Sequence, residues 1–198
     1  MASLRALLGV VLCSLMVSAS EILPQADFDV QGVAGKWYLT GVCSNFKWLV
    51  CRKANMKSGT VMVEPTEDGG LKVVSSHLLD SCWKIETLAT KTDVPGKFTF
   101  SIPLFFTSFL LLFPLLSVTG FVTEMRVVDV KPDEYGLNHY INTGRNETFV
   151  ESRLYGRSLD LSAEVKEKFN QLCLQTGILP ENIVHLPKTE ECPLECFV

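Results

Sequence analysis

The stretch FDVQGVAGKW at residues 28–37 decides the fold of this chain. Gly35 and Trp37 frame one polar residue at the start of a predicted strand, Lys36–Val42, and the residues before them predict a short turn that closes this end. Because side chains alternate along a strand, Trp37 is expected to point inward and Tyr38 outward. A Gly-x-Trp motif alone also fits an ordinary core tryptophan behind a turn glycine.

The first twenty residues predict a signal peptide. Arg5 precedes an apolar run, Ala6–Val17, that ends in small residues at 18–20, and the run is shorter than the roughly 20 residues of a membrane-spanning helix. We therefore expect residues 21–198 to form one secreted, extracellular domain. Loss of Arg5 from the 18 basic and 22 acidic residues leaves 17 against 22, a net charge of −5, so no nucleic acid partner is expected.

Six cysteines remain after the expected cleavage: Cys43, Cys51, Cys82, Cys173, Cys192 and Cys196. In a secreted domain they predict disulfides, and six cysteines permit 15 pairings among which sequence does not choose. No close cysteine pair is matched by a second Cys or His pair, and the three histidines are scattered, so we expect no metal site and no cofactor.

Eight β-prone runs, separated by turn residues, predict an all-β fold. Consecutive hairpins at this spacing form an antiparallel sheet, and eight strands in meander order can close into an up-and-down barrel that holds one small ligand. A helix follows, with Ser162 as N-cap and Gly177 after its end, and its apolar face is expected to pack outside the barrel. The predicted strands are Lys36–Val42, Thr60–Glu64, Leu71–Leu79, Trp83–Ala89, Phe98–Ile102, Val122–Val130, Tyr135–Ile141 and Thr148–Tyr155, with Asn182–Leu186 as a further short strand.

These features together resemble the lipocalin family. Besides Gly35-Lys36-Trp37, the segment DEYG at residues 133–136 is similar to the family's turn between the sixth and seventh strands. LYGR at residues 154–157 is similar to the family segment whose arginine lies across the tryptophan ring. The resemblance implies that Arg157 stacks on Trp37 at the closed end of the barrel. It gives structural roles to Gly35, Trp37, Asp133, Tyr135, Tyr155, Gly156 and Arg157.

Within the family, the chain most resembles the lipocalin-type prostaglandin D synthases. The similar segments are Trp48-Leu49, TEDGGL at 66–71, KEKF at 166–169 and IVHLP at 183–187. Those enzymes need a thiol on the second strand, where this chain has Gly59, so we expect no catalytic residue there. Cys51, in the loop before that strand, is expected either to pair with Cys43 or, less favoured, to be a reactive thiol.

The resemblance implies a bridge between Cys82 and Cys192, and Cys173 with Cys196 is a candidate for a further bridge. Asn146-Glu147-Thr148 lies between two predicted strands and predicts N-glycosylation at Asn146.

The apolar segment at residues 104–117 departs from the family pattern, in which a short polar turn joins strands five and six. A transmembrane helix there would place Trp37 and Arg157 on opposite sides of a bilayer, so we expect no membrane span and favour a protein without membrane contact. Two alternatives remain. The first is an apolar loop that guards the barrel mouth or dips into a membrane surface. The second is an error in the gene model, in which the pyrimidine-rich tract before a splice acceptor has been translated. We favour the second hypothesis, which transcript reads across the junction test.

We expect the protein to be a non-enzymatic carrier of one small hydrophobic molecule, such as a fatty acid, a retinoid or a prostanoid. A prostaglandin D synthase-like isomerase and a receptor-contacting signalling lipocalin are the alternatives. The candidate ligand contacts, most of them chosen by strand parity and each also compatible with plain barrel core, are Leu39, Trp48, Val61, Val63, Val73, Ser75 and His77.

Overall fold

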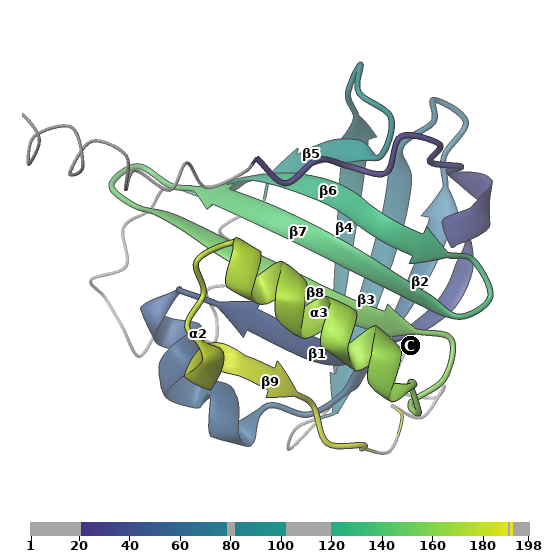
Figure 1. Cartoon of the computed structure of the whole chain (residues 1–198). Helices are drawn as coiled ribbons and strands as arrows, with labels where there is room; N and C mark the ends of the chain where they lie inside the picture. The colour runs from purple at the N-terminus through teal and green to yellow at the C-terminus, as the bar shows by residue number, and fades with distance from the viewer. Residues whose placement is uncertain (1–20, 79–81, 102–119, 190, 192–198) are drawn as a thin grey trace, which may run out of the picture.

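The computed structural model describes residues 21–78, 82–101, 120–189 and 191 (Figure 1). The expected signal peptide, the apolar segment 104–117, Cys192 and Cys196 lie outside these residues. Predictions that concern them therefore stay predictions.

Eight antiparallel strands form a closed barrel, as expected from the sequence (Figure 1). Each strand pairs with the next one in the chain, and β1 closes the sheet by pairing with both β2 and β8. A ninth strand, β9 (Ile183–His185), pairs with β1 beyond its contact with β2. The barrel strands are β1 (Gly35–Ser44), β2 (Gly59–Pro65), β3 (Leu71–Leu78), β4 (Cys82–Lys91), β5 (Lys97–Ser101), β6 (Val122–Lys131), β7 (Tyr135–Thr143) and β8 (Thr148–Gly156).

The expected helix is α3 (Ala163–Gln175). The Ser162 side chain accepts a hydrogen bond from the Val165 amide at 3.3 Å, and Gly177 ends the helix with a positive φ of 77°. A second helix, α2 (Lys47–Arg52), occupies the segment that the sequence analysis assigned to a loop. Three short 3-10 turns complete the described chain: η1 (Gln31–Val33), η2 (Lys53–Asn55) and η4 (Pro180–Asn182).

Two apolar cores share the wall formed by β1, β7 and β8. The first lies inside the barrel and includes Trp37 at the closed end. The second lies outside, where α3 crosses the three strands (Figure 1) and inserts Phe169, which is fully buried. Gly41 of β1 permits this approach, because a Cβ atom there would lie 2.9 Å from the Phe169 ring. Apolar side chains therefore pack against both faces of this wall.

Arg157 stacks on Trp37 at the closed end of the barrel, as the resemblance implied. The guanidinium carbon lies 3.7 Å from the centre of the indole ring. Arg157 donates to the carbonyls of Lys36 and Ala34, each at 2.8 Å, and the indole N–H donates to the Val33 carbonyl at 2.8 Å. Gly35 has a φ of 94°, so a residue with a side chain would be strained at this turn.

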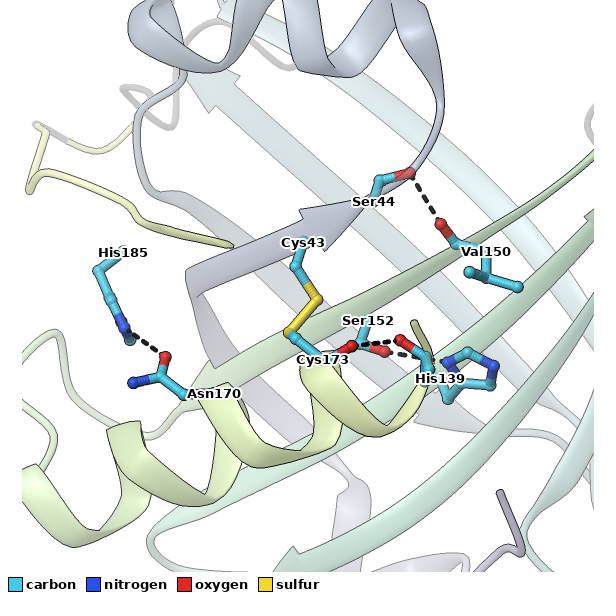
Figure 2. Close-up of a disulfide and its surroundings, with 9 residues drawn as sticks. Cys43, Ser44, His139, Val150, Ser152, Asn170, Cys173 and His185 are labelled. Atoms are coloured by element: carbon cyan, nitrogen blue, oxygen red, sulfur yellow. Dashed lines mark hydrogen bonds between the residues drawn. A yellow bond between two sulfur atoms is a disulfide. The ribbon is translucent and has the colours of Figure 1, made fainter. Parts of the chain in front are cut away.

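A bulge in β1 explains why the observed disulfide pairing differs from the predicted one. The register with β8 shifts between Leu39 and Gly41, so the residues after the bulge exchange faces. Cys43 therefore points outward to α3 and forms a disulfide with Cys173, whose Cα lies 6.2 Å away (Figure 2). The expected pairings Cys43–Cys51 and Cys173–Cys196 are wrong.

Cys51 lies on α2 as an exposed free thiol, and Cys43 is already bonded to Cys173. Cys82, the first residue of β4, is disulfide-bonded, but its expected partner Cys192 lies outside the described residues. Asn146 is exposed in the turn between β7 and β8, where glycosylation stays a prediction. Within the described part of the chain, no helix has both the length and the apolar character needed to cross a membrane.

Candidate ligand-binding site

The barrel encloses an inner chamber of about 60 Å³ beside Trp37. Alternating residues of β2, β3 and β6 place aliphatic side chains on this space, while Gly136 and Asn138 border it from β7. Its full lining is Val33, Trp37, Val61, Val63, Leu71, Val73, Met125, Val127, Val130, Gly136, Asn138, Tyr140 and Tyr155. The chamber is therefore suited to an apolar group.

A larger and more polar chamber of about 240 Å³ lies between this space and the barrel mouth. Its lining adds His77 at the end of β3, Thr123 at the start of β6, and Glu151 and Arg153 on β8. Thr123 Oγ1 donates to Asn142 Oδ1 at 2.7 Å, which satisfies the polar groups of one wall. A ligand that fills both chambers would meet the charged groups at one end only.

Four side chains border both chambers: Val73, Met125, Tyr140 and Tyr155. The two tyrosine hydroxyls lie 3.1 Å apart, and Asn138 donates to the Tyr140 hydroxyl at 3.3 Å. Burial raises the pKa of Tyr140 well above its ordinary value, so its hydroxyl stays neutral. These hydroxyls supply neutral hydrogen-bonding groups at the boundary.

An ion pair lies inside the outer chamber. Arg153 Nε donates to Glu151 Oε1, and the guanidinium carbon lies 4.8 Å from the centre of the Tyr140 ring. The Arg153 side chain stays 36% accessible because it borders open space, whereas the Glu151 side chain is 9% accessible. Burial, and secondarily the charge of Arg153, lowers the pKa of His77, so this imidazole is neutral at pH 7.

Gly59, at the position where the resemblance called for a thiol, has no room for one. A Cβ atom there would contact the His77 imidazole, with Cε1 at 2.7 Å, and the Ser76 carbonyl at 2.8 Å. Real Cβ atoms essentially never approach other atoms this closely, so both the His77 ring and the Ser76 backbone would have to shift. The His77 ring thus occupies the space beside Gly59.

The structure brings together five of the seven predicted contact residues. Val61 and Val63 line the inner chamber, Ser75 and His77 line the outer one, and Val73 borders both. Leu39 is buried in the inner core but lines neither chamber. Trp48 lies on α2 with 45% of its surface exposed, and Arg52 is placed 4.8 Å over its ring.

The prediction missed the contribution of β7 and β8. Tyr140, Glu151 and Arg153 face the lumen, yet strand parity was counted only from Trp37 and Gly59. A signal for two of them was present: Glu151 and Arg153 have the same parity as Tyr155 in the LYGR motif. A charged pair on the inward face of a strand was therefore visible in the sequence.

Comparisons with known proteins agree with this architecture. Residues 34–190 match the Lipocalin / cytosolic fatty-acid binding protein family. A protein named Lipocalin from Rhinella marina is 34% identical, with 94% of this chain and 98% of that protein aligned. Prostaglandin-H2 D-isomerase from Mus musculus is 29% identical, with 97% and 98% aligned. In a structure described as "The Siderocalin Ex-FABP functions through dual ligand specificities", 82% of this chain and 95% of that one superpose with a TM-score of 0.65 at 20% identity.

Proposed function

Because this chain belongs to the lipocalin family, we propose that it is a secreted carrier that binds one small, mainly hydrophobic molecule inside its barrel. The observation that carries the proposal is the apolar chamber over Trp37, which shares four lining residues with a second chamber that has polar groups. Burial of apolar ligand surface supplies about 25 cal/mol per Å², and the few polar groups orient the molecule.

Fatty acids, retinoids and prostanoids are the ligand classes that we propose. Fatty acids and retinoids combine an apolar body with one polar end, which matches the two chambers, whereas prostanoids carry further oxygen atoms along the molecule. The outer chamber, at about 240 Å³, is just below the roughly 300–1,000 Å³ typical of small-molecule sites. This volume favours the smaller members of these classes.

We propose that the protein has no prostaglandin D-isomerase activity, although such isomerases are among its relatives. Gly59 supplies no thiol, and the His77 ring fills the space that a thiol would need. Turnover of the prostaglandin endoperoxide by the purified chain would contradict this proposal. Loss of such turnover in Cys51→Ala would show that the exposed thiol is responsible, and a receptor-contacting role stays a prediction from sequence.

Titration of the purified full chain with retinol and with fluorescent fatty acids tests the carrier function. Val63 borders the inner chamber, so Val63→Phe should fill part of it and weaken binding at least about tenfold. The neighbouring Met62 is 40% exposed on the outside of β2, and Met62→Phe is the matched control. Absence of saturable binding to every probe, or equal weakening by both variants, would contradict the proposal.

A further inference from the structure

Among the described residues, Arg153 is the only cation that lines either chamber, and its charge is only partly matched. Its Nε donates to Glu151, but among the described residues Nη1 and Nη2 have no hydrogen-bond partner. Every buried side-chain nitrogen or oxygen in that part of the chain does have a partner. The two Nη atoms therefore border the open space of the chamber.

The surroundings of Arg153 fix the direction of its guanidinium. Glu151 accepts a hydrogen bond from Nε on one edge of the guanidinium. The guanidinium carbon lies 4.8 Å from the centre of the Tyr140 ring, which packs against one face of the group. The remaining pair of N–H groups forms a fork, which matches the two oxygens of a carboxylate. An arginine side chain loses little additional freedom when its position is already fixed in this way.

Charges around the chamber favour one negative group and no more. Glu151 already neutralises part of the Arg153 charge, and His77 contributes no positive charge at neutral pH. Glu86 also borders the chamber, although its carboxylate lies 3.8 Å from Lys72. A second negative group would find no further cation among the described lining residues, so a dianion would be disfavoured.

We propose that the barrel binds a small amphipathic monocarboxylate, with its carboxylate on the Arg153 fork and its apolar chain in the inner chamber over Trp37. This inference rests on the carrier function proposed above and names the ligand class for it. The Tyr140 and Tyr155 hydroxyls lie at the boundary, where the chain leaves the carboxylate. An alcohol of equal length lacks the charge that pairs with Arg153, so the site discriminates by the head group.

Calorimetric titration of the purified full chain with decanoate and with 1-decanol at pH 7.4 tests this proposal. We expect decanoate to bind at least about tenfold tighter than decanol, because hydrogen bonds to a charged group are the stronger ones. Arg153→Gln should weaken decanoate binding about 10- to 100-fold and leave decanol binding unchanged. Arg145→Gln, in the exposed turn before β8, is the matched control for loss of an arginine.

Glu151→Gln gives a result that a purely structural role of Arg153 would not produce. It keeps an acceptor for Arg153 Nε but removes the competing charge, so decanoate binding should tighten while decanol binding stays constant. This variant also keeps the test decisive if Arg153→Gln fails to fold.

Equal affinity of the wild-type chain for decanoate and decanol would overturn the inference and leave the carrier function standing. Unchanged decanoate binding in both Arg153→Gln and Glu151→Gln would overturn the inference as well. Failure of decanoate, decanol and retinol alike would overturn the carrier function together with the inference.

Discussion

Arg157 stabilises the closed end of the barrel through its planar shape as well as its charge. Its face covers the indole ring of Trp37, while its edge donates to carbonyls on the β1 side and to Pro132 in the β6–β7 turn, at 2.6 Å. The Arg157 amide also donates to the Glu134 carbonyl at 2.9 Å. A single side chain thus connects three segments that are far apart in sequence.

The first prediction concerns the coupling of Trp37 and Arg157. Trp37→Ala removes a ring that is 4% exposed and should cost about 3–5 kcal/mol of unfolding free energy. Arg157→Lys should cost less, because an ammonium group keeps the charge but lacks the face and the fork. In urea unfolding, the double variant should be non-additive by about 1 kcal/mol, and additivity within about 0.3 kcal/mol would rule out the coupling.

A second residue-scale prediction follows from His139, which is 3% exposed and lies 3.0 Å from the Ser152 hydroxyl near the disulfide (Figure 2). Burial, helped by the charge of Arg126, lowers the pKa of His139 from 6.5 to about 4. The unfolded chain therefore binds a proton in a pH range where the folded chain does not. The stability is complete above pH 6.5 and decreases as the pH falls towards 4.

Urea unfolding at pH 7.5 and pH 5.0 measures this effect. Between these values the wild-type chain should lose about 2 kcal/mol more stability than His139→Gln, since the variant has no group to titrate at this position. The carboxylates titrate equally in both proteins and cancel in the comparison. Parallel losses in the two proteins would show that His139 is not the responsible group.

At the scale of the elements, the Cys43–Cys173 bridge fixes α3 on the wall of β1, β7 and β8. It closes a segment of 130 residues, so it restricts the unfolded chain strongly. Cys43→Ala with Cys173→Ala should reduce the unfolding free energy by about 2–5 kcal/mol. Cys51→Ser, at an exposed free thiol, is the control and should change stability by less than about 0.5 kcal/mol. A bridge-free variant as stable as the control would contradict this role.

Sequence patterns predicted the elements much better than the local deviations within them. All eight barrel strands and α3 were found because alternation, turn residues and the Ser162 cap are local signals. The bulge between Leu39 and Gly41 has no comparable signal, because it arises from the register between β1 and β8. The predicted strand ended at Val42, so Cys43 was expected to pair with Cys51 rather than to face α3 from β1. The helix α2 was missed because its six residues are too few for a periodic pattern.

The contrast between local sequence patterns and strand register also explains which lining residues of the chambers were predicted. Parity along β2 and β3 identified Val61, Val63, Val73, Ser75 and His77, since no register shift interrupts their pairing. Leu39 was also assigned to the inside correctly, but it packs in the core without bordering either chamber. Parity determines the face of a residue, whereas the shape of the cavity depends on all strands together.

For the whole molecule, ligand occupancy should appear as added stability. At a free ligand concentration of about 100 times Kd, a ligand that binds only the folded chain raises the unfolding free energy by about 2.7 kcal/mol. The gain should be of equal size in the variant without the Cys43–Cys173 bridge, because that bridge lies outside the barrel wall. Thermal unfolding with and without decanoate checks this, and a gain confined to the bridged protein would show that the two cores are not independent.

The bulge in β1 has an evolutionary consequence. Deleting one residue between Leu39 and Val42 would return the strand to uniform alternation and leave Val42 inside and Cys43 outside, because the bulge accommodates one extra residue. One codon lost here would therefore keep Cys43 on the face that meets Cys173, so the bulge is the position in β1 where a deletion is tolerated best. Related genes are expected to vary in length in the exposed β2–β3 and β7–β8 turns and, within β1, only at this bulge.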